Sequence, residues 1–175
     1  MFAGKTEELM RRLRRAQIAK QKIQIFKHTL DARYKKRNLS SHDGLTIKAT
    51  AVADSSQIEK KLKPDVEIVA IDEAQFFDGG IIDVVNSFVD RGKRVLVAGI
   101  ERDFRDEAFG PMPSLLIAAE EVTKLTAICS VCGSEATRNQ RLINGKPAKY
   151  TDPVVLPGAK DTYEARCRTH FVLRR

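Results

Sequence analysis

The sequence has few aromatic residues, only three cysteines and no long apolar run. A membrane-spanning helix needs roughly 20 consecutive apolar residues, and no stretch approaches that length. The start of the chain is basic and polar and lacks the apolar core of a signal peptide. Two of the cysteines form one C-x-x-C pair, which suits metal binding in a reduced compartment better than disulfides. These features predict a cytoplasmic protein without a membrane partner.

Acidic residues are also in the minority, since 31 Lys and Arg face 23 Asp and Glu and give a formal net charge of +8. Such an excess invites a nucleic-acid partner. The basic residues are spread along the chain, apart from a cluster at Arg11, Arg12, Arg14 and Arg15. A solvated helix face, or attraction of a polyphosphate substrate, explains this cluster equally well, and few aromatic residues lie near it for base stacking. Nucleic-acid binding is therefore the weaker interpretation.

The 175 residues suit one domain of ordinary size, or one domain with a small appendage. Apolar periodicity predicts helices over residues 6–20, 55–62, 81–90 and 114–121. Apolar runs predict strands over residues 23–27, 45–50, 66–71, 94–99 and 122–128. Strands that alternate with helices predict an α/β fold with a parallel sheet flanked by helices. The phosphate-loop tripeptide described below makes this a P-loop-type parallel sheet.

The strand expected over residues 66–71 is almost wholly apolar and rich in β-branched side chains, and Asp72 and Glu73 follow it at once. A continuous apolar run of this length is typical of a strand covered on both faces. Its carboxyl end lies at the edge where α/β sheets bind ligands. The two carboxylates are therefore candidates for holding a metal and handling a reacting hydroxyl, although solvated acids at the end of a strand are the simpler alternative.

The first expected helix opens with Gly4-Lys5-Thr6, the second half of the phosphate-loop pattern G-x-x-x-x-G-K-[ST]. Amides at the start of such a helix bind phosphate oxygens, the lysine reaches the β- and γ-phosphates, and the threonine hydroxyl contacts Mg²⁺. The leading glycine of the pattern, and the strand before it, would lie just upstream of Met1. The tripeptide alone is a weak signal.

Near the end of the chain, Cys129-x-x-Cys132 and Cys167-x-x-His170 use every cysteine in the sequence. Four thiolate and imidazole ligands in two such pairs close a tetrahedron around Zn²⁺ and leave no position for water, so we predict a structural zinc site. The alternative is three unpaired thiols and an unrelated histidine. A hairpin is expected over residues 136–147, and residues 154–163 form a loop whose ends the zinc would hold. Such a loop can present backbone groups to a flat heterocycle, or it is an ordinary surface loop.

Residues 28–44 are polar and lack a period, which predicts a long loop. His28 and His42 are interpreted as loop histidines without a partner. Asp31 and Arg33 either form an ion pair or face the solvent.

Several segments resemble the small, zinc-containing thymidine kinases of bacteria and animals. They are, in order, MFAGKTEEL, LDARY, SHDG, IDEAQFFD, VAGIERDFRDEAFGP, VTKLTAICSVCG and TYEARCRTH, and they cover nearly the whole chain. The resemblance implies transfer of the γ-phosphoryl group of ATP to the 5′-hydroxyl of thymidine or deoxyuridine. It also implies a P-loop domain over residues 1–128, a zinc-binding lasso domain over residues 129–175, and a homotetramer.

The resemblance also assigns roles to residues. Glu73 falls on the catalytic base, and Asp72 on a residue that helps to hold Mg²⁺. The residues matched to ATP, phosphate or Mg²⁺ binding are Met1, Phe2, Ala3, Gly4, Lys5, Thr6, Asp72, Glu73, Ala74 and Gln75. Those matched to nucleoside binding are Met1, Phe76, Ile100, Phe104, Val154, Val155, Leu156, Pro157, Gly158 and Tyr163. The zinc ligands implied are Cys129, Cys132, Cys167 and His170.

Two departures from the family pattern stand out. If the chain truly begins at Met1, a strand and part of the phosphate cradle are missing, and we expect a weakened kinase with an exposed sheet edge. Met1 as an internal methionine of a longer protein is the simpler explanation. Asn139 replaces the threonine usual near the base, which bears on substrate preference rather than on the reaction. Two rival hypotheses are a zinc-stabilised nucleic-acid-binding module and a P-loop ATPase.

Overall fold

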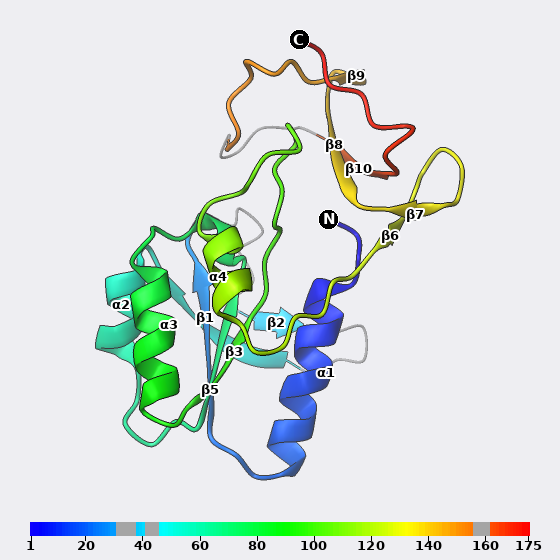
Figure 1. Ribbon diagram of the computed structural model, residues 1–175. Coiled ribbons are helices and arrows are strands. Elements are labelled where there is room, and N and C mark those ends of the chain that lie inside the picture. Colours follow the sequence, from blue (N-terminus) through cyan, green and yellow to red (C-terminus); the bar gives the residue numbers. More distant parts are fainter. Residues whose placement is uncertain (31–37, 41–45, 156–161) are drawn as a thin grey trace.

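The computed structural model describes residues 1–30, 38–40, 46–155 and 162–175 (Figure 1). Its main-body elements are α1 (Lys5–Ile18), β1 (Ile23–His28), β2 (Asn38–Ser40), β3 (Thr46–Val52), α2 (Ser55–Lys61), β4 (Ile68–Asp72), the 3₁₀ turn η1 (Ala74–Phe76), α3 (Ile81–Asp90), β5 (Arg94–Val97) and α4 (Met112–Ala118). Five short strands follow: β6 (Ala127–Ile128), β7 (Glu135–Ala136), β8 (Arg138–Ile143), β9 (Lys146–Pro147) and β10 (Thr162–Arg166).

The main sheet has the strand order β2-β3-β1-β4-β5. Strands β3, β1, β4 and β5 are parallel, and only the edge strand β2 is antiparallel. Strand β4 is the one on which the site is built, and all five of its residues are buried. This confirms the predicted α/β architecture, in which apolar strands buried on both faces are joined by helical crossovers.

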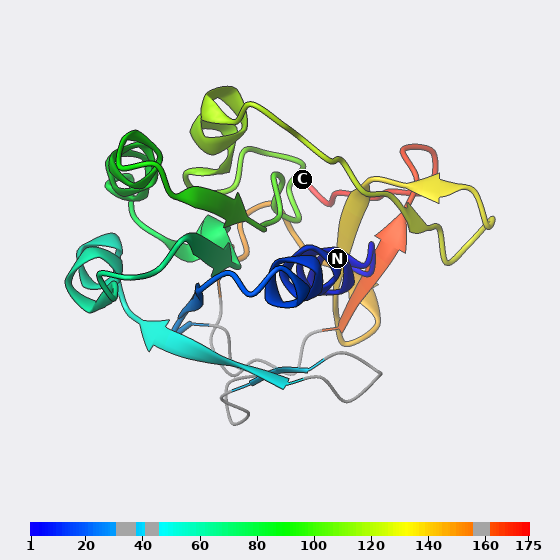
Figure 2. The ribbon, with the colours of Figure 1, turned by 90° about the horizontal axis from the view of Figure 1, so that it is seen from below.

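Successive residues of β4 pack on opposite faces of the sheet. Ile68 and Ala70 join the core beneath α1, whereas Val69 and Ile71 join the core beneath α2, α3 and α4. Figure 2 shows α1 on one side of the sheet and α2 and α3 on the other. The period-two alternation of a strand thus divides one continuous apolar run between two helical layers.

The C-terminal part contains two small antiparallel sheets, β6-β7 and β10-β8-β9. It lies close to the start of the chain in Figure 1, and Ala3 packs against its apolar cluster of Ala127, Cys129, Ala136 and Ala165. The hairpin predicted over residues 136–147 is confirmed as β8 and β9. The strand β10, which pairs with β8, was not predicted.

Four predictions differ from the structure. The long loop expected over residues 28–44 contains the strand β2, Asn38–Ser40, which pairs with β3. The helix expected over residues 114–121 is α4, Met112–Ala118, because Pro113 is tolerated in the first turn of a helix. The strand expected over residues 122–128 is reduced to Ala127–Ile128, because residues 121–126 have no neighbouring strand in the described part of the chain. His28, interpreted as a loop histidine, instead ends β1 and is buried.

His28 is held by its neighbours on both ring nitrogens. Its Nδ1 accepts a hydrogen bond from the Leu30 amide at 3.0 Å, and its Nε2 lies 2.7 Å from the Ala53 carbonyl oxygen. The ring also packs edge-on against Phe77. The other residues discussed for this loop, Asp31, Arg33 and His42, lie outside the described residues. None of the described helices is long and apolar enough to cross a bilayer.

Candidate functional site

The expected phosphate loop forms the start of α1. Gly4 precedes the helix with a φ of 73°, a left-handed conformation that glycine adopts without steric cost. Lys5 and Thr6 follow in the first helical turn and are both half-buried, while Phe2 is 65% exposed. The free amides of this turn, together with the helix dipole, form an anion-binding end of the helix.

The chain turns sharply where β4 ends. Asp72 is the last strand residue, and Glu73 adopts a left-handed conformation with φ 53° before the turn η1. Non-glycine residues in this region store strain and concentrate at functional sites. Both carboxylates are buried, with Asp72 1% and Glu73 5% exposed. The structure therefore places two acids inside the protein rather than in solvent, which disfavours the interpretation as solvated strand-end acids.

Asp72 is a buried carboxylate next to a second acid and a lysine. Its Oδ1 accepts the Glu73 amide at 3.0 Å, and its Oδ2 lies 4.0 Å from the Lys27 ammonium. Burial, and then the neighbouring Glu73 charge, raise the pKa of Asp72 to about 6, and Lys27 and Lys5 oppose this rise. A buried anion next to a second carboxylate gains from a metal cation, and a carboxylate oxygen is the ligand type that Mg²⁺ prefers.

Gln75 orients Glu73. Its side-chain amide donates to Glu73 Oε2 at 2.6 Å, and its side-chain oxygen Oε1 accepts the Ile100 amide at 3.1 Å. Gly110 lies so close that a Cβ added there would stand 2.2 Å from the backbone carbonyl oxygen of Gln75. Gln75, matched above to ATP or Mg²⁺ binding, is therefore seen in this structure holding the candidate base and the start of the loop after β5.

The two phenylalanines matched to the nucleobase, Phe76 and Phe104, have different surroundings. Phe76 is half-buried and packs edge-on against Phe109, while its neighbour Phe77 belongs to the core. Phe104 is buried, and two guanidinium groups lie over its ring, those of Arg141 at 5.1 Å and Arg105 at 5.5 Å from the ring centroid.

The two arginines also hold the start of the lasso segment. Arg105 donates to the Asp152 carbonyl oxygen at 2.8 Å, and Arg141 donates to that of Pro153. Val154 and Tyr163 are half-buried, and Val155 is 36% exposed. Leu156, Pro157 and Gly158, between them, lie outside the described residues.

Met1 joins the start of the chain to the C-terminal sheet. Its amine donates to the side-chain oxygen of Asn139 on β8, and Asn139 in turn donates to the Arg102 carbonyl oxygen at 3.2 Å. Burial, and then Lys5, lower the pKa of this amine to about 6, whereas Glu73 acts in the opposite direction. Met1 and Asn139 therefore lie at the same edge as Glu73.

The predicted metal ligands come together. The ligand atoms of Cys129, Cys132, Cys167 and His170 all lie within 4.8 Å of one another. Zn–S bonds of about 2.3 Å in a tetrahedron place two sulfurs roughly 3.8 Å apart, and Cys132 Sγ lies 3.8 Å from Cys167 Sγ. His170 Nδ1 lies 3.2 Å from the same Cys167 sulfur. This set of ligands fits Zn²⁺ with all four positions filled by protein.

Backbone turns build the cluster. Gly133, at φ 72°, donates to the Cys129 carbonyl oxygen, and the Cys129 amide donates to that of Ser134. Burial opposes the Cys129 thiolate, but hydrogen bonds from the amides of residues 167, 131 and 132 outweigh it and lower the pKa of this thiol to about 6. A thiol that ionises readily is a good metal ligand.

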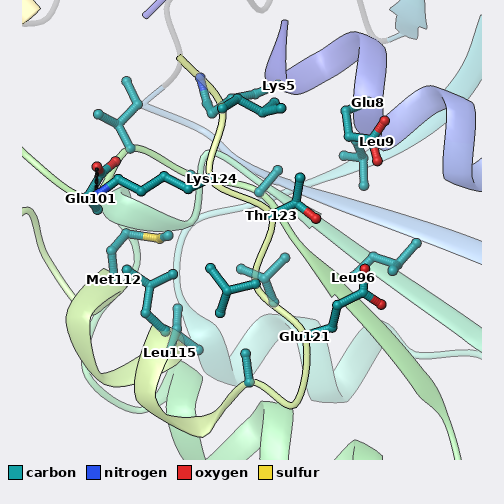
Figure 3. A pocket seen from close by; sticks show the side chains of 18 of the residues that line it. Lys5, Glu8, Leu9, Leu96, Glu101, Met112, Leu115, Glu121, Thr123 and Lys124 are labelled. Carbon is teal, nitrogen blue, oxygen red and sulfur yellow. Dashed lines mark ion pairs between the residues drawn. The ribbon is translucent and has the colours of Figure 1, made fainter. Parts of the chain in front are cut away.

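A cavity of about 710 Å³ lies beside β5, bounded by α1, α4 and residues 120–125 (Figure 3). Met1, Lys5, Gly99 and Ile100 line one end of it, but neither Asp72 nor Glu73 does. The large cavity is thus adjacent to the two buried acids and distinct from them.

Sequence reasoning missed Lys27, Arg105 and Arg141. Lys27 ends a strand that was assigned only as structure, and its place beside Asp72 follows from the pairing of β1 with β4. Neither arginine stands in a pattern that indicates burial, and only the packing on Phe104 reveals their role.

A glycine-initiated helix, two buried acids at the end of a parallel strand and a Cys₃His cluster are brought together on an α/β fold, as the resemblance to the zinc-containing nucleoside kinases implies. Comparison with family models agrees, because the thymidine kinase family matches residues 1–171. The chain belongs to the thymidine kinase family.

Proposed function

We propose that the chain transfers the γ-phosphoryl group of ATP to the 5′-hydroxyl of thymidine, and of deoxyuridine. The observation that carries this proposal is Glu73, a buried carboxylate oriented by Gln75 at the carboxyl edge of the central strand. Family membership supports a nucleoside as the acceptor. Phosphoryl transfer depends on positioning and on neutralising charge, so one base, one lysine and a metal-binding acid suffice.

In this proposal Glu73 accepts the proton of the 5′-hydroxyl. The amides from Gly4 to Thr6 bind the β- and γ-phosphates, and Lys5 pairs with their charge. Asp72 and the Thr6 hydroxyl would hold Mg²⁺, which would neutralise the negative charge that develops on the phosphate groups. The Lys27 ammonium, next to Asp72, offsets part of the repulsion between the adjacent carboxylates of Asp72 and Glu73.

We propose that residues 129–175 act as a zinc-held lasso unit over the nucleobase, next to the catalytic part in residues 1–128. Phe104, with Arg105 and Arg141 over its ring, would form one wall of the pocket, and Phe76, Ile100 and Tyr163 would form others. Hydrogen bonds from Arg105 and Arg141 hold the carbonyl oxygens of residues 152 and 153. The lasso segment follows directly, so the position of its first residue is fixed. Preorganisation of this kind lowers the ordering cost of binding.

The paired state of the basic cluster weighs against a nucleic-acid-binding module. Arg11 and Arg12 both pair with Glu8, and Arg12 also pairs with Glu121. Positive charge engaged with carboxylates is less available to a phosphate backbone.

The decisive experiment incubates the protein with ATP, Mg²⁺ and thymidine and measures thymidine monophosphate. Glu73→Gln should lower kcat at least about 100-fold with little change in thymidine affinity, because it removes the proton acceptor but keeps the shape. Loss of ATP without a phosphorylated nucleoside would identify an ATPase. Full turnover by the Gln variant would exclude Glu73 as the base.

A further inference from the structure

The two pairs of candidate zinc ligands lie in separate segments of the chain. Cys129 and Cys132 belong to the turn between β6 and β7, and Cys167 and His170 follow β10. We call residues 129–132 the first ligand turn and residues 167–170 the second. Of the four ligands only Cys129 is buried. Packing therefore fixes the two turns only in part, and polar contacts between them matter for the shape of the site.

Ser130, inside the first ligand turn, contacts β10 through its backbone and its side chain. Its amide donates to the Ala165 carbonyl oxygen at 3.0 Å, and its hydroxyl donates to Glu164 Oε2 at 3.1 Å. The hydroxyl also lies 3.3 Å from the Ala165 carbonyl oxygen. Because Ser130 stands between two of the ligands, these bonds hold the first ligand turn against the strand that leads into the second.

Arg166 extends this network to the second ligand turn. Its Nε and one of its terminal nitrogens both donate to Glu164 Oε2, the former at 2.8 Å. The other terminal nitrogen lies 3.5 Å from the His170 carbonyl oxygen. Glu164 and Arg166 are two residues apart on β10 and so share one face of the strand. One carboxylate oxygen thus receives a hydroxyl from the first ligand turn and a guanidinium that reaches the second.

We propose that Ser130, Glu164 and Arg166 form a brace that sets the zinc affinity of the cluster, with Glu164 as its central positioning residue. The four ligand positions are filled by other side chains, so Glu164 acts through the two turns and not on the metal. Groups that orient metal ligands in this way typically contribute about 10–100-fold to metal affinity. The Glu164 and Arg166 side chains are 34% and 21% exposed, so we expect the lower end of this range.

The charge of the site explains why the brace contains an arginine. Three thiolates and one imidazole leave a net negative charge on a Zn²⁺ site. A lone carboxylate nearby would oppose that charge, but Arg166 pairs with Glu164 and neutralises it. The brace therefore joins the two turns without adding repulsion to the site, provided that both members of the pair are present.

This inference stands on the zinc cluster and does not depend on the proposed reaction. The test uses the zinc-loaded 175-residue chain and measures the zinc dissociation constant by competition with a chromophoric chelator. The absorption spectrum of the Co²⁺-substituted protein reports the set of ligands. The matched control is Glu135→Gln, because Glu135 on β7 is an exposed carboxylate without a side-chain partner among the described residues.

Glu164→Gln should weaken zinc binding about tenfold, and Glu135→Gln should leave it unchanged. Arg166→Met should weaken binding further than Glu164→Gln, because it leaves the Glu164 carboxylate unpaired beside a negative site. Combining the two changes should restore the affinity of Glu164→Gln alone. The Co²⁺ bands should keep the positions of a tetrahedral Cys₃His site in every variant, since the ligands do not change.

Ser130→Ala removes only a hydroxyl from an exposed turn and so tests the brace with little risk to folding. It should weaken zinc binding about threefold in the wild-type chain, the size expected of one hydrogen bond, and have little further effect in Glu164→Gln. Wild-type affinity in Glu164→Gln would overturn the proposal, as would independent effects of the Ser130 and Glu164 changes. Shifted Co²⁺ bands in Glu164→Gln would also overturn it, because Glu164 would then act on the ligand set itself.

Discussion

The side-chain amide of Gln75 donates to the Glu73 carboxylate at 2.6 Å, and the backbone carbonyl of the same Gln75 lies against Gly110. The orientation of the candidate base therefore depends on a glycine in another loop. A Cβ at position 110 would stand 2.2 Å from the Gln75 oxygen, and backbone cannot yield as a flexible side chain does.

Gly110→Ala should therefore displace Gln75 and misalign Glu73. We expect kcat to fall by about 100-fold, the size of effect that a shift of roughly 1 Å produces in a positioned group. The matched control is Gly92→Ala, which shares a positive φ but has nothing within 4 Å of its added Cβ. It should cost only about 1–2 kcal/mol of stability, measured by urea unfolding, with normal kcat. Equal kcat losses in the two variants would contradict the role of Gln75.

The elements around Glu73 were predictable because their signals are local. A short apolar run followed by Asp72 and Glu73 indicates a buried strand that ends at a ligand-binding edge, and β4 has this form. The zinc cluster was equally predictable from the two C-x-x-C/H pairs, because its chemistry depends on spacing in the sequence. Gly4-Lys5-Thr6 was a weaker signal, although it correctly placed the start of α1.

The predictions that were wrong have a different physical origin, because they depended on contacts that are distant in the sequence. His28 looked unpartnered because its partners, Ala53 and Phe77, are distant in the sequence. The strand expected over residues 122–128 had the right composition, but a strand exists only where a neighbour accepts its hydrogen bonds. The β-propensity of residues 122–128 does not show whether a neighbouring strand is present.

Arg141 should control nucleoside affinity rather than turnover. It is 1% exposed, lies over the Phe104 ring and donates to the Pro153 carbonyl oxygen. Arg141→Met keeps the apolar stem but loses the guanidinium, so Phe104 and residue 153 lose their common support. We expect KM for thymidine to rise about tenfold, equal to roughly 1.4 kcal/mol, while KM for ATP stays unchanged.

The control for Arg141 is Arg91→Met. Arg91 also places its guanidinium over a phenylalanine, 4.9 Å from the Phe88 centroid, but on the surface at the end of α3. This variant should leave both KM values at wild-type levels. A parallel rise in both KM values for Arg141→Met would indicate general loosening instead of a role in the nucleoside pocket.

Removal of zinc should loosen the C-terminal part and spare the main sheet. Without the metal, the described backbone contacts that tie the end of this segment to its start are the β8-β10 ladder and the hydrogen bond from the Ser130 amide to the Ala165 carbonyl oxygen. Cys132→Ser should reduce bound zinc from about one equivalent per chain and speed proteolytic cleavage between residues 145 and 165. Exchange at β1 and β4 should stay slow. An intact C-terminal part in a zinc-free variant would contradict a structural metal, and a chelator should have no further effect on Cys132→Ser.

Glu8 should make the stability of α1 dependent on acid. Hydrogen bonds from Arg11, and then Arg12, lower the pKa of Glu8 from 4.5 to about 2. A carboxyl whose pKa is lower in the folded state stabilises the fold above its unfolded value, and this contribution disappears as pH falls from about 4.5 towards 2. Because the pair is partly exposed, Glu8→Gln should cost only about 0.5–1 kcal/mol at pH 7. The difference should vanish near pH 2, as measured by urea unfolding across this range. Glu7→Gln, in the same turn, is the control and should leave stability nearly unchanged at both pH values. A Glu8→Gln deficit that persisted at the acid limit would show that packing, and not charge, carries the effect.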